Sequence, residues 1–159
     1  MKIKLITVGK VKEKYFCDAI AEYSKRLSKY ISLEIIEVPD EMTPDKAKPG
    51  EVAVILAKEG DRILSKISEK DFVITLEILG KKLTSEALAS KLENIMNSGN
   101  STIDLIIGGS LGLDDRIKSR SNFALSLSDM TFPHQLMRVV LLEQIYRAFK
   151  IINNEPYHK

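Results

Sequence analysis

Glycines gather in one short stretch of the chain, Ile107–Gly112 (IGGSLG), directly after an apolar run. Gly9 and Gly80 also follow apolar runs. In open α/β sheets, ligands bind beyond the carboxyl ends of the strands, and glycine there lets a ligand approach the backbone closely. The stretch therefore predicts a ligand site, although a plain tight turn between a strand and a helix has the same composition.

Several common kinds of site do not fit the residues. The glycine spacing after the fourth apolar run is not that of a dinucleotide fingerprint, and the chain has no Gly-Lys-Ser/Thr phosphate loop. No set of serine, histidine and carboxylate residues forms a plausible catalytic triad. The two histidines and the single cysteine are far apart in the sequence, so their spacing predicts no metal site.

A second polar stretch, 125–134 (LSLSDMTFPH), places hydroxyl and carboxylate side chains beside apolar ones. Such a mixture suits a ligand that has an apolar base and polar edges. The alternative is a loop that leads into a helix and is capped by its own side chains.

The last predicted helix is apolar almost all round, which indicates either central burial or a subunit interface. Its Glu143, Arg147 and Lys150 share one face by their spacing. With the tail 157–159 (YHK), the arginine and lysine are suited to binding phosphates. The alternatives are a routine Glu143–Arg147 ion pair and a frayed tail.

Composition bounds the class of protein. The chain has 159 residues, of which 44% are hydrophobic and 29% charged, as in an ordinary globular domain. The net charge of +2 does not by itself indicate nucleic-acid binding. A single cysteine fits a reducing compartment, and we expect Cys17 to be a small core residue. With no signal peptide and no apolar run long enough for a bilayer, we expect a cytoplasmic protein with no membrane contact.

Apolar runs alternate with amphipathic stretches along the chain. Strands are predicted over 3–8, 32–38, 71–76, 102–107 and 122–127. Helices are predicted over 13–29, 51–68, 85–97, shortly after 113, and over 133–153. The proline-rich segment 39–50 between them is a predicted loop. This alternation predicts a single α/β domain over 1–159: a three-layer fold with a mainly parallel sheet covered on both faces.

Three blocks of the sequence resemble the RlmH family of SPOUT-class methyltransferases: 107–113 (IGGSLGL), 125–148 (LSLSDMTFPHQLMRVVLLEQIYRA) and 155–159 (EPYHK). The resemblance extends over the whole chain and includes 59–64 (EGDRIL) and 75–81 (TLEILGK). It implies a homodimer with a C-terminal trefoil knot. It also implies S-adenosylmethionine as methyl donor and a pseudouridine of large-subunit ribosomal RNA, methylated at N3 on the assembled ribosome, as product. DNA is not expected as a partner.

The resemblance also implies a cofactor site and an acceptor site. The cofactor site comprises Leu76, Gly108, Leu127, Ser128, Asp129, Met130, Thr131 and Phe132. Arg147, Tyr157 and His158 match family positions implicated in activity. We expect Arg147 to stabilise negative charge on the uracil ring or to hold a phosphate, Tyr157 to stack on the base, and His158 to accept the N3 proton. His134 and Arg138 are expected to be structural or to lie near the interface.

Two other functions compete with this one. The first is a non-catalytic ribosome-binding module with a vestigial cofactor pocket, which would bind ribosomes without transferring a methyl group. The second is a small nucleotide-binding enzyme, which the missing phosphate loop disfavours. A monomer of charge +2 would bind RNA weakly. We therefore hypothesise a dimer in which one subunit donates its tail to the site of the other.

Overall fold

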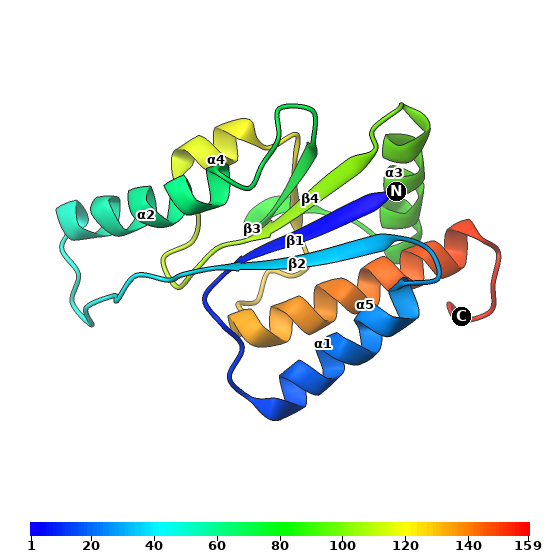
Figure 1. Ribbon diagram of the computed structural model, residues 1–159, viewed down its shortest axis with the longest axis horizontal. Helices are drawn as coiled ribbons and strands as arrows, with labels where there is room; N and C mark the ends of the chain where they lie inside the picture. The colour runs from blue at the N-terminus through cyan, green and yellow to red at the C-terminus, as the bar shows by residue number, and fades with distance from the viewer.

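The computed structural model describes residues 1–159 as a five-stranded sheet between two layers of helices (Figure 1). In chain order the elements are β1 (Lys2–Val8), α1 (Lys14–Leu27), β2 (Ser32–Val38), α2 (Pro49–Leu64), β3 (Phe72–Lys82), α3 (Ser85–Asn97), β4 (Thr102–Ile107), α4 (Asp115–Arg120), β5 (Phe123–Ser126) and α5 (His134–Ile152).

The strand order is β2-β1-β4-β3-β5, and every pairing in the sheet is parallel. All strands therefore end at the same edge, where the loops that follow them come together. The predicted parallel α/β sheet is confirmed, as is the alternation of strands and helices. The fully buried run of β4, in which Ile103, Leu105, Ile106 and Ile107 are at most 4% exposed, is typical of a central parallel strand.

Two apolar cores cover the two faces of the sheet. The larger one joins the sheet to α1, α3 and α5, and the smaller one joins it to α2 and α4. Figure 1 shows α2 and α4 on one side of the strands and α1 and α5 on the other. Alternation along β1 explains the division, because Ile3 and Leu5 belong to the larger core and Ile6 and Val8 to the smaller one.

Three sequence predictions need correction. Cys17 is exposed and not part of the core, because Phe16, Ile20, Tyr23 and Leu27 form the inward stripe of α1 and Cys17 lies about 100° away from it on the helical wheel. Helix α2 begins at Pro49, within the predicted loop, since proline is suited to the first turn of a helix. Strand β3 continues to Lys82 and does not end at Leu76.

The extension of β3 includes an irregularity in its pairing with β5. Leu76 pairs with Leu125, and the next pair is Lys81 with the same Leu125. The intervening residues 77–80 therefore leave the ladder as a bulge at the carboxyl edge of the sheet. Gly80 allows the bulge to lie against β5, because a Cβ there would be 2.8 Å from the backbone carbon of Leu125.

No residue of helix α5 is fully exposed: seven of its 19 residues are buried and the others are partly buried. It packs against both α1 and α3 beneath the sheet. This packing accounts for part of the apolar surface of α5, and the partly buried residues leave both central burial and a subunit interface as explanations of its composition.

Candidate functional site

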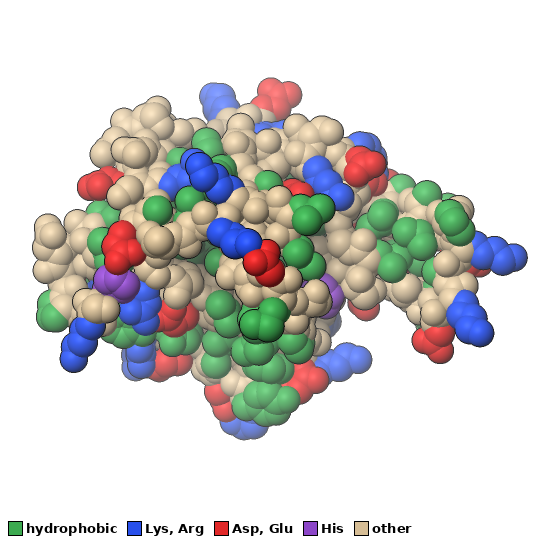
Figure 2. All heavy atoms as spheres, turned by 180° about the vertical axis from the view of Figure 1, so that it is seen from behind, with side chains coloured by type: hydrophobic (Ala, Val, Ile, Leu, Met, Phe, Trp, Pro, Cys, Tyr) green, Lys and Arg blue, Asp and Glu red, His purple; other side chains and the backbone are tan.

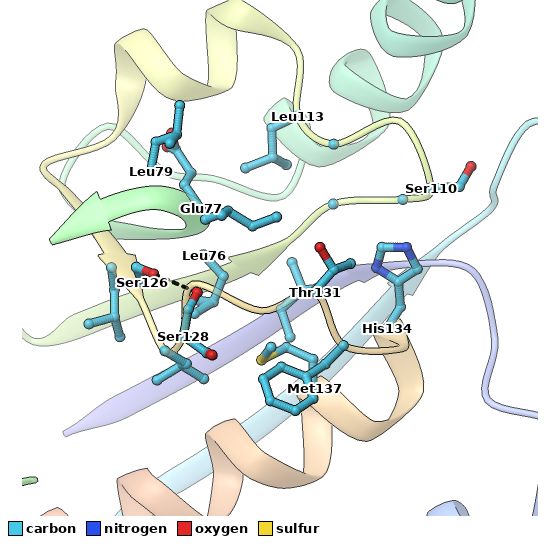
Figure 3. Close-up of a pocket in the computed structure, with 18 of the residues that line it drawn as sticks. Leu76, Glu77, Leu79, Ser110, Leu113, Ser126, Ser128, Thr131, His134 and Met137 are labelled. Atoms are coloured by element: carbon cyan, nitrogen blue, oxygen red, sulfur yellow. Dashed lines mark hydrogen bonds between the residues drawn. The ribbon is translucent and has the colours of Figure 1, made fainter. Parts of the chain in front are cut away.

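A cleft of about 360 Å³ opens at the carboxyl edge of the sheet, within the size range of small-molecule sites. Its walls are the bulge after Leu76, the glycine loop after β4, the loop 127–132 and the start of α5 (Figure 3). Of the eight residues expected to bind the cofactor, seven line this cleft: Leu76, Gly108, Leu127, Ser128, Met130, Thr131 and Phe132. The fold thus gathers segments that are about 50 residues apart in the sequence.

Asp129 is the exception among the eight. Its carboxylate forms an ion pair with Lys82, at 2.5 Å, and its side chain is 78% exposed. The side chain therefore points away from the cleft, and only the backbone of this residue belongs to the loop that forms the wall.

The glycine loop after β4 has no room for a side chain at Gly108. A Cβ on Gly108 would overlap the carbonyl group of Gly112 and crowd Leu113. Gly112 has a φ of +89°, in the region that favours glycine. Residues 108–112 (GGSLG) also match the Gly-x-Ser-x-Gly sequence motif of a nucleophile elbow. However, the Ser110 hydroxyl lies 3.3 Å from that of Thr43 and is hydrogen-bonded to no histidine, so no triad is present.

The loop 127–132 is held by its own hydroxyl groups. Ser126 donates to the carbonyl oxygen of Ser128 at 3.1 Å (Figure 3). The Ser128 hydroxyl accepts from the N–H of Met130 at 2.9 Å. The local side-chain bonding considered as an alternative is therefore present within the loop, although the N-terminus of α5 has no side-chain cap. It does not compete with a ligand site, because it leaves the apolar side of the loop facing the cleft.

Sequence reasoning missed several residues of the cleft. Glu77, Ile78 and Leu79 line it because of the bulge in β3, and Lys118, His134 and Met137 line it from α4 and α5. Gly80 after an apolar run was the available signal for the bulge. Burial, together with the charge of Arg138, lowers the pKa of His134 below its usual value, so this histidine is neutral at neutral pH.

Arg138 has the structural role expected for it. Its guanidinium is 3% exposed and donates to the carboxylate of Glu37 at 2.7 Å. It also donates to the carbonyl oxygens of Val8 and Gly9, each at 2.9 Å. The side chain thus ties the start of α5 to the end of β1, beneath the cleft.

Arg147, Tyr157 and His158 form a second cluster, at the far end of α5. The Arg147 guanidinium lies 4.7 Å from the centre of the Tyr157 ring and 3.4 Å from Nδ1 of His158. Glu143 accepts from Arg147 at 2.6 Å and from the Tyr157 hydroxyl at 3.2 Å. Nε2 of His158 lies 2.8 Å from the carboxylate of Glu86. The structure thus brings the three expected acceptor-site residues together.

The tail that carries this cluster is docked on the protein, so it is not frayed. Asn154 reverses the chain with a φ of +52°. Glu155 then accepts from Lys29, Tyr30 and Lys150 at 2.7–2.9 Å. These contacts lower the pKa of Glu155 to about 2, with Lys150 as the largest cause. Burial raises the pKa of Tyr157 to about 12, so its phenol keeps its proton at neutral pH.

The cleft and the tail cluster lie apart within one chain. Met137 lines the cleft and Arg147 belongs to the cluster, and ten residues of helix separate them by about 15 Å. A single chain therefore does not combine the two sets of residues into one site.

The structure offers no group of three histidine, cysteine or acidic side chains arranged to hold a metal ion. None of its helices combines the length and apolar character that crossing a bilayer requires.

Comparisons with known proteins agree with this geometry. A family model described as a SPOUT methyltransferase matches residues 1–158. Proteins named ribosomal RNA large subunit methyltransferase H are similar over the full length of both chains, with 63% identity for the one from Bifidobacterium adolescentis and 58% for the one from Streptococcus suis. A solved structure of a methylase family protein from Haemophilus influenzae matches 99% of this chain and 70% of its own, with a TM-score of 0.53 and 12% identity. This last likeness concerns the fold alone.

Proposed function

The chain belongs to the SPOUT methyltransferase family, and from this premise we propose that it methylates N3 of a pseudouridine in large-subunit ribosomal RNA. The proposed methyl donor is S-adenosylmethionine and the proposed substrate is the assembled ribosome, which places the reaction in the cytoplasm. The observation that carries the proposal is the cleft at the carboxyl edge of the sheet, where the glycine loop and the loop 127–132 meet. The names of the relatives, which are ribosomal RNA methyltransferases, support the substrate class.

The cleft suits S-adenosylmethionine in its shape and chemistry. Leu76, Leu127 and Phe132 offer apolar surface for an adenine ring, and the backbone of 127–132 offers polar groups for the ring's edge. Gly108 and Gly109 allow the loop to pack in this position, because a Cβ on Gly108 would overlap Gly112 and a Cβ on Gly109 would crowd Glu59 and Val8. When bound, S-adenosylmethionine supplies a methyl group on a positively charged sulfur. Glu77, the only carboxylate residue lining the cleft, complements that charge.

The tail cluster suits the acceptor base. His158 has Nδ1 as a proton acceptor when Nε2 donates to Glu86, so it is our candidate for removing the N3 proton. Arg147 keeps its positive charge, since the hydrogen bonds that it donates to Glu143 raise its pKa, and it can stabilise an anionic uracil ring. Tyr157 offers an aromatic face for stacking and, with its raised pKa, does not act as a base.

The separation of the two sets supports a homodimer in which each site takes its cleft from one subunit and its tail from the other. In Figure 2, apolar side chains form a patch on the helical layer of α1 and α5. Tyr15 is 67% exposed there, and Leu136 and Val140 of α5 are only partly buried. Such a patch is suited to a two-fold contact with a second copy.

We also propose that the C-terminal segment is knotted. The chain crosses the carboxyl edge of the sheet after β5, between two loops that line the same cleft. It passes from the face covered by α4 to the face on which α5 packs against α1 and α3. This path is consistent with threading through a loop, which few folds show.

Calorimetric titration with S-adenosylmethionine, with NAD as control, tests the cofactor proposal. We expect saturable binding of S-adenosylmethionine only. Labelled methyl transfer to ribosomes that lack the modification then tests the reaction. A folded dimer that binds ribosomes without transferring a methyl group would contradict the proposal and favour the non-catalytic module.

A further inference from the structure

The turn Glu59–Arg62 of α2 contacts the loops around the cleft, although none of its four residues lines the cleft. Gly60 packs so closely on α4 that a Cβ would lie 2.9 Å from the Cβ of Asp114. Asp61 accepts from Arg116 at 2.8 Å. Arg62 donates to the carbonyl oxygen of Pro39 at 2.9 Å and to Glu41 at 2.5 Å. The turn therefore joins α4 and the segment that follows β2.

Glu59 is the buried member of this turn, with 5% exposure. Its Oε1 accepts from the N–H of Glu41 at 3.0 Å. On its other side the carboxylate lies against Gly109: a Cβ on Gly109 would be 3.0 Å from Oε2. Gly109 lines the cleft, as does Ser110, whose hydroxyl is 3.3 Å from that of Thr43. One carboxylate thus touches both the glycine loop and the segment after β2.

Burying the carboxylate of Glu59 costs free energy, which indicates that this side chain has a specific role. Burial raises the pKa of Glu59, and the negative charges of Asp40 and Glu41 add to this effect. The N–H of Glu41 and the charge of Arg62 oppose it. A buried methionine or leucine would avoid this cost and fill similar volume.

We propose that Glu59 is a positioning residue of the cleft: its carboxylate fixes the glycine loop against the segment 39–43 and so sets the wall that the methyl donor meets. This inference rests on the proposed cofactor site. It predicts that Glu59 affects binding of S-adenosylmethionine without touching it.

The test compares Glu59→Ala and Glu59→Gln with Glu51→Ala in the full-length protein. Glu51 is a matched control, because it lies on the same helix and accepts a backbone N–H, that of Lys48 at 2.8 Å, but contacts no residue of the cleft. We expect Glu59→Ala to weaken S-adenosylmethionine binding in calorimetry by about tenfold, the effect of one lost hydrogen bond to a charged group. Glu59→Gln keeps an acceptor oxygen for Glu41 and should recover most of the affinity. Glu51→Ala should leave affinity unchanged.

A double-mutant cycle with Gly109→Ala separates positioning from general destabilisation. In the wild type the new methyl group meets the Glu59 carboxylate, and Val8 at 3.2 Å, and should weaken binding. With Glu59→Ala, space opens for it, so the two effects should be clearly less than additive. Equal affinity of Glu59→Ala and wild type, or strict additivity in folded variants, would overturn the inference. Failure of the wild type to bind S-adenosylmethionine would instead overturn the proposed function.

Discussion

At the scale of single residues, Glu77 gives the cleft its only carboxylate. One of its oxygens accepts from Thr75 at 2.6 Å, which orients the side chain. We expect Glu77→Gln to weaken binding of S-adenosylmethionine by about fivefold or more, because a negative charge near a cation is lost. S-adenosylhomocysteine has an uncharged sulfur and should lose less affinity. Calorimetry with both compounds measures the difference, and equal losses would argue against attraction to the sulfonium.

His158 is the residue on which the proposed proton transfer depends. We expect His158→Ala to leave S-adenosylmethionine affinity unchanged and to reduce turnover on ribosomes by about a hundredfold, as for a general base. Glu86→Gln, which keeps a partner for Nε2 at 2.8 Å, is the control and should have a small effect. Unchanged turnover in His158→Ala would exclude this histidine as the base.

At the scale of elements, Arg138 joins α5 to β1. Replacing it with methionine leaves the carbonyl oxygens of Val8 and Gly9 without their donor and removes the partner of Glu37. We expect Arg138→Met to lower the free energy of unfolding by about 2–4 kcal/mol in urea denaturation. Arg26→Met, which breaks the exposed pair with Glu22, should cost much less. Similar losses in both variants would contradict this role.

A buried triad links β1, β4 and the start of β3. Lys4 pairs with Asp71 at 2.6 Å and with Asp104 at 3.1 Å, so one positive charge is shared by two carboxylates. Burial raises the pKa of Asp104 to about 6, against the opposing effect of Lys4. A raised acid pKa means that the folded state holds the proton more tightly than the unfolded state. The contribution of Asp104 to the free energy of unfolding is therefore fully present below about pH 4 and is lost as the pH rises to about 6.

Asp104→Asn should remove the loss of stability that the Asp104 carboxylate causes as the pH rises. We expect it to raise the free energy of unfolding at pH 7 by about 1–3 kcal/mol relative to the wild type and to change it little at pH 4. Urea denaturation between pH 4 and pH 7 measures the effect, with Asp18→Asn, in an exposed pair with Lys14, as control. A variant that is no more stable than the wild type at pH 7 would contradict the prediction.

At the scale of the whole molecule, the composite site can be tested by mixing subunits. Arg147→Ala disables the tail, and Thr131→Trp fills the cleft at an exposed position. If each site combines two subunits, a refolded equal mixture should regain about a quarter of wild-type methyl transfer, since half of the dimers contain one intact site. Each variant alone should be inactive. If both parts came from one chain, mixing would restore nothing.

The sequence by itself determined the elements and the identity of the loops that carry the cleft. Apolar runs and helical stripes depend on local periodicity, so nine of the ten elements were placed within a few residues. The glycines at 107–112 and the polar stretch 125–134 pointed to the two loops of the cleft. The specific blocks at 107–113 and 125–148 pointed to the family. These features depend on residues that are close together in the sequence, so the sequence alone is enough to recognise them.

Only the tertiary structure decided what depends on distant contacts. The bulge that brings Glu77 into the cleft arises from a shift in pairing between β3 and β5, which no local pattern specifies. The contact of Glu59 with Gly109 joins residues from separate strand–helix units. The distance between the cleft and the tail cluster depends on the direction of α5 across the sheet. The tertiary structure also decided that the side chains of Cys17 and Asp129 are exposed, because this depends on which side of each segment faces the protein interior.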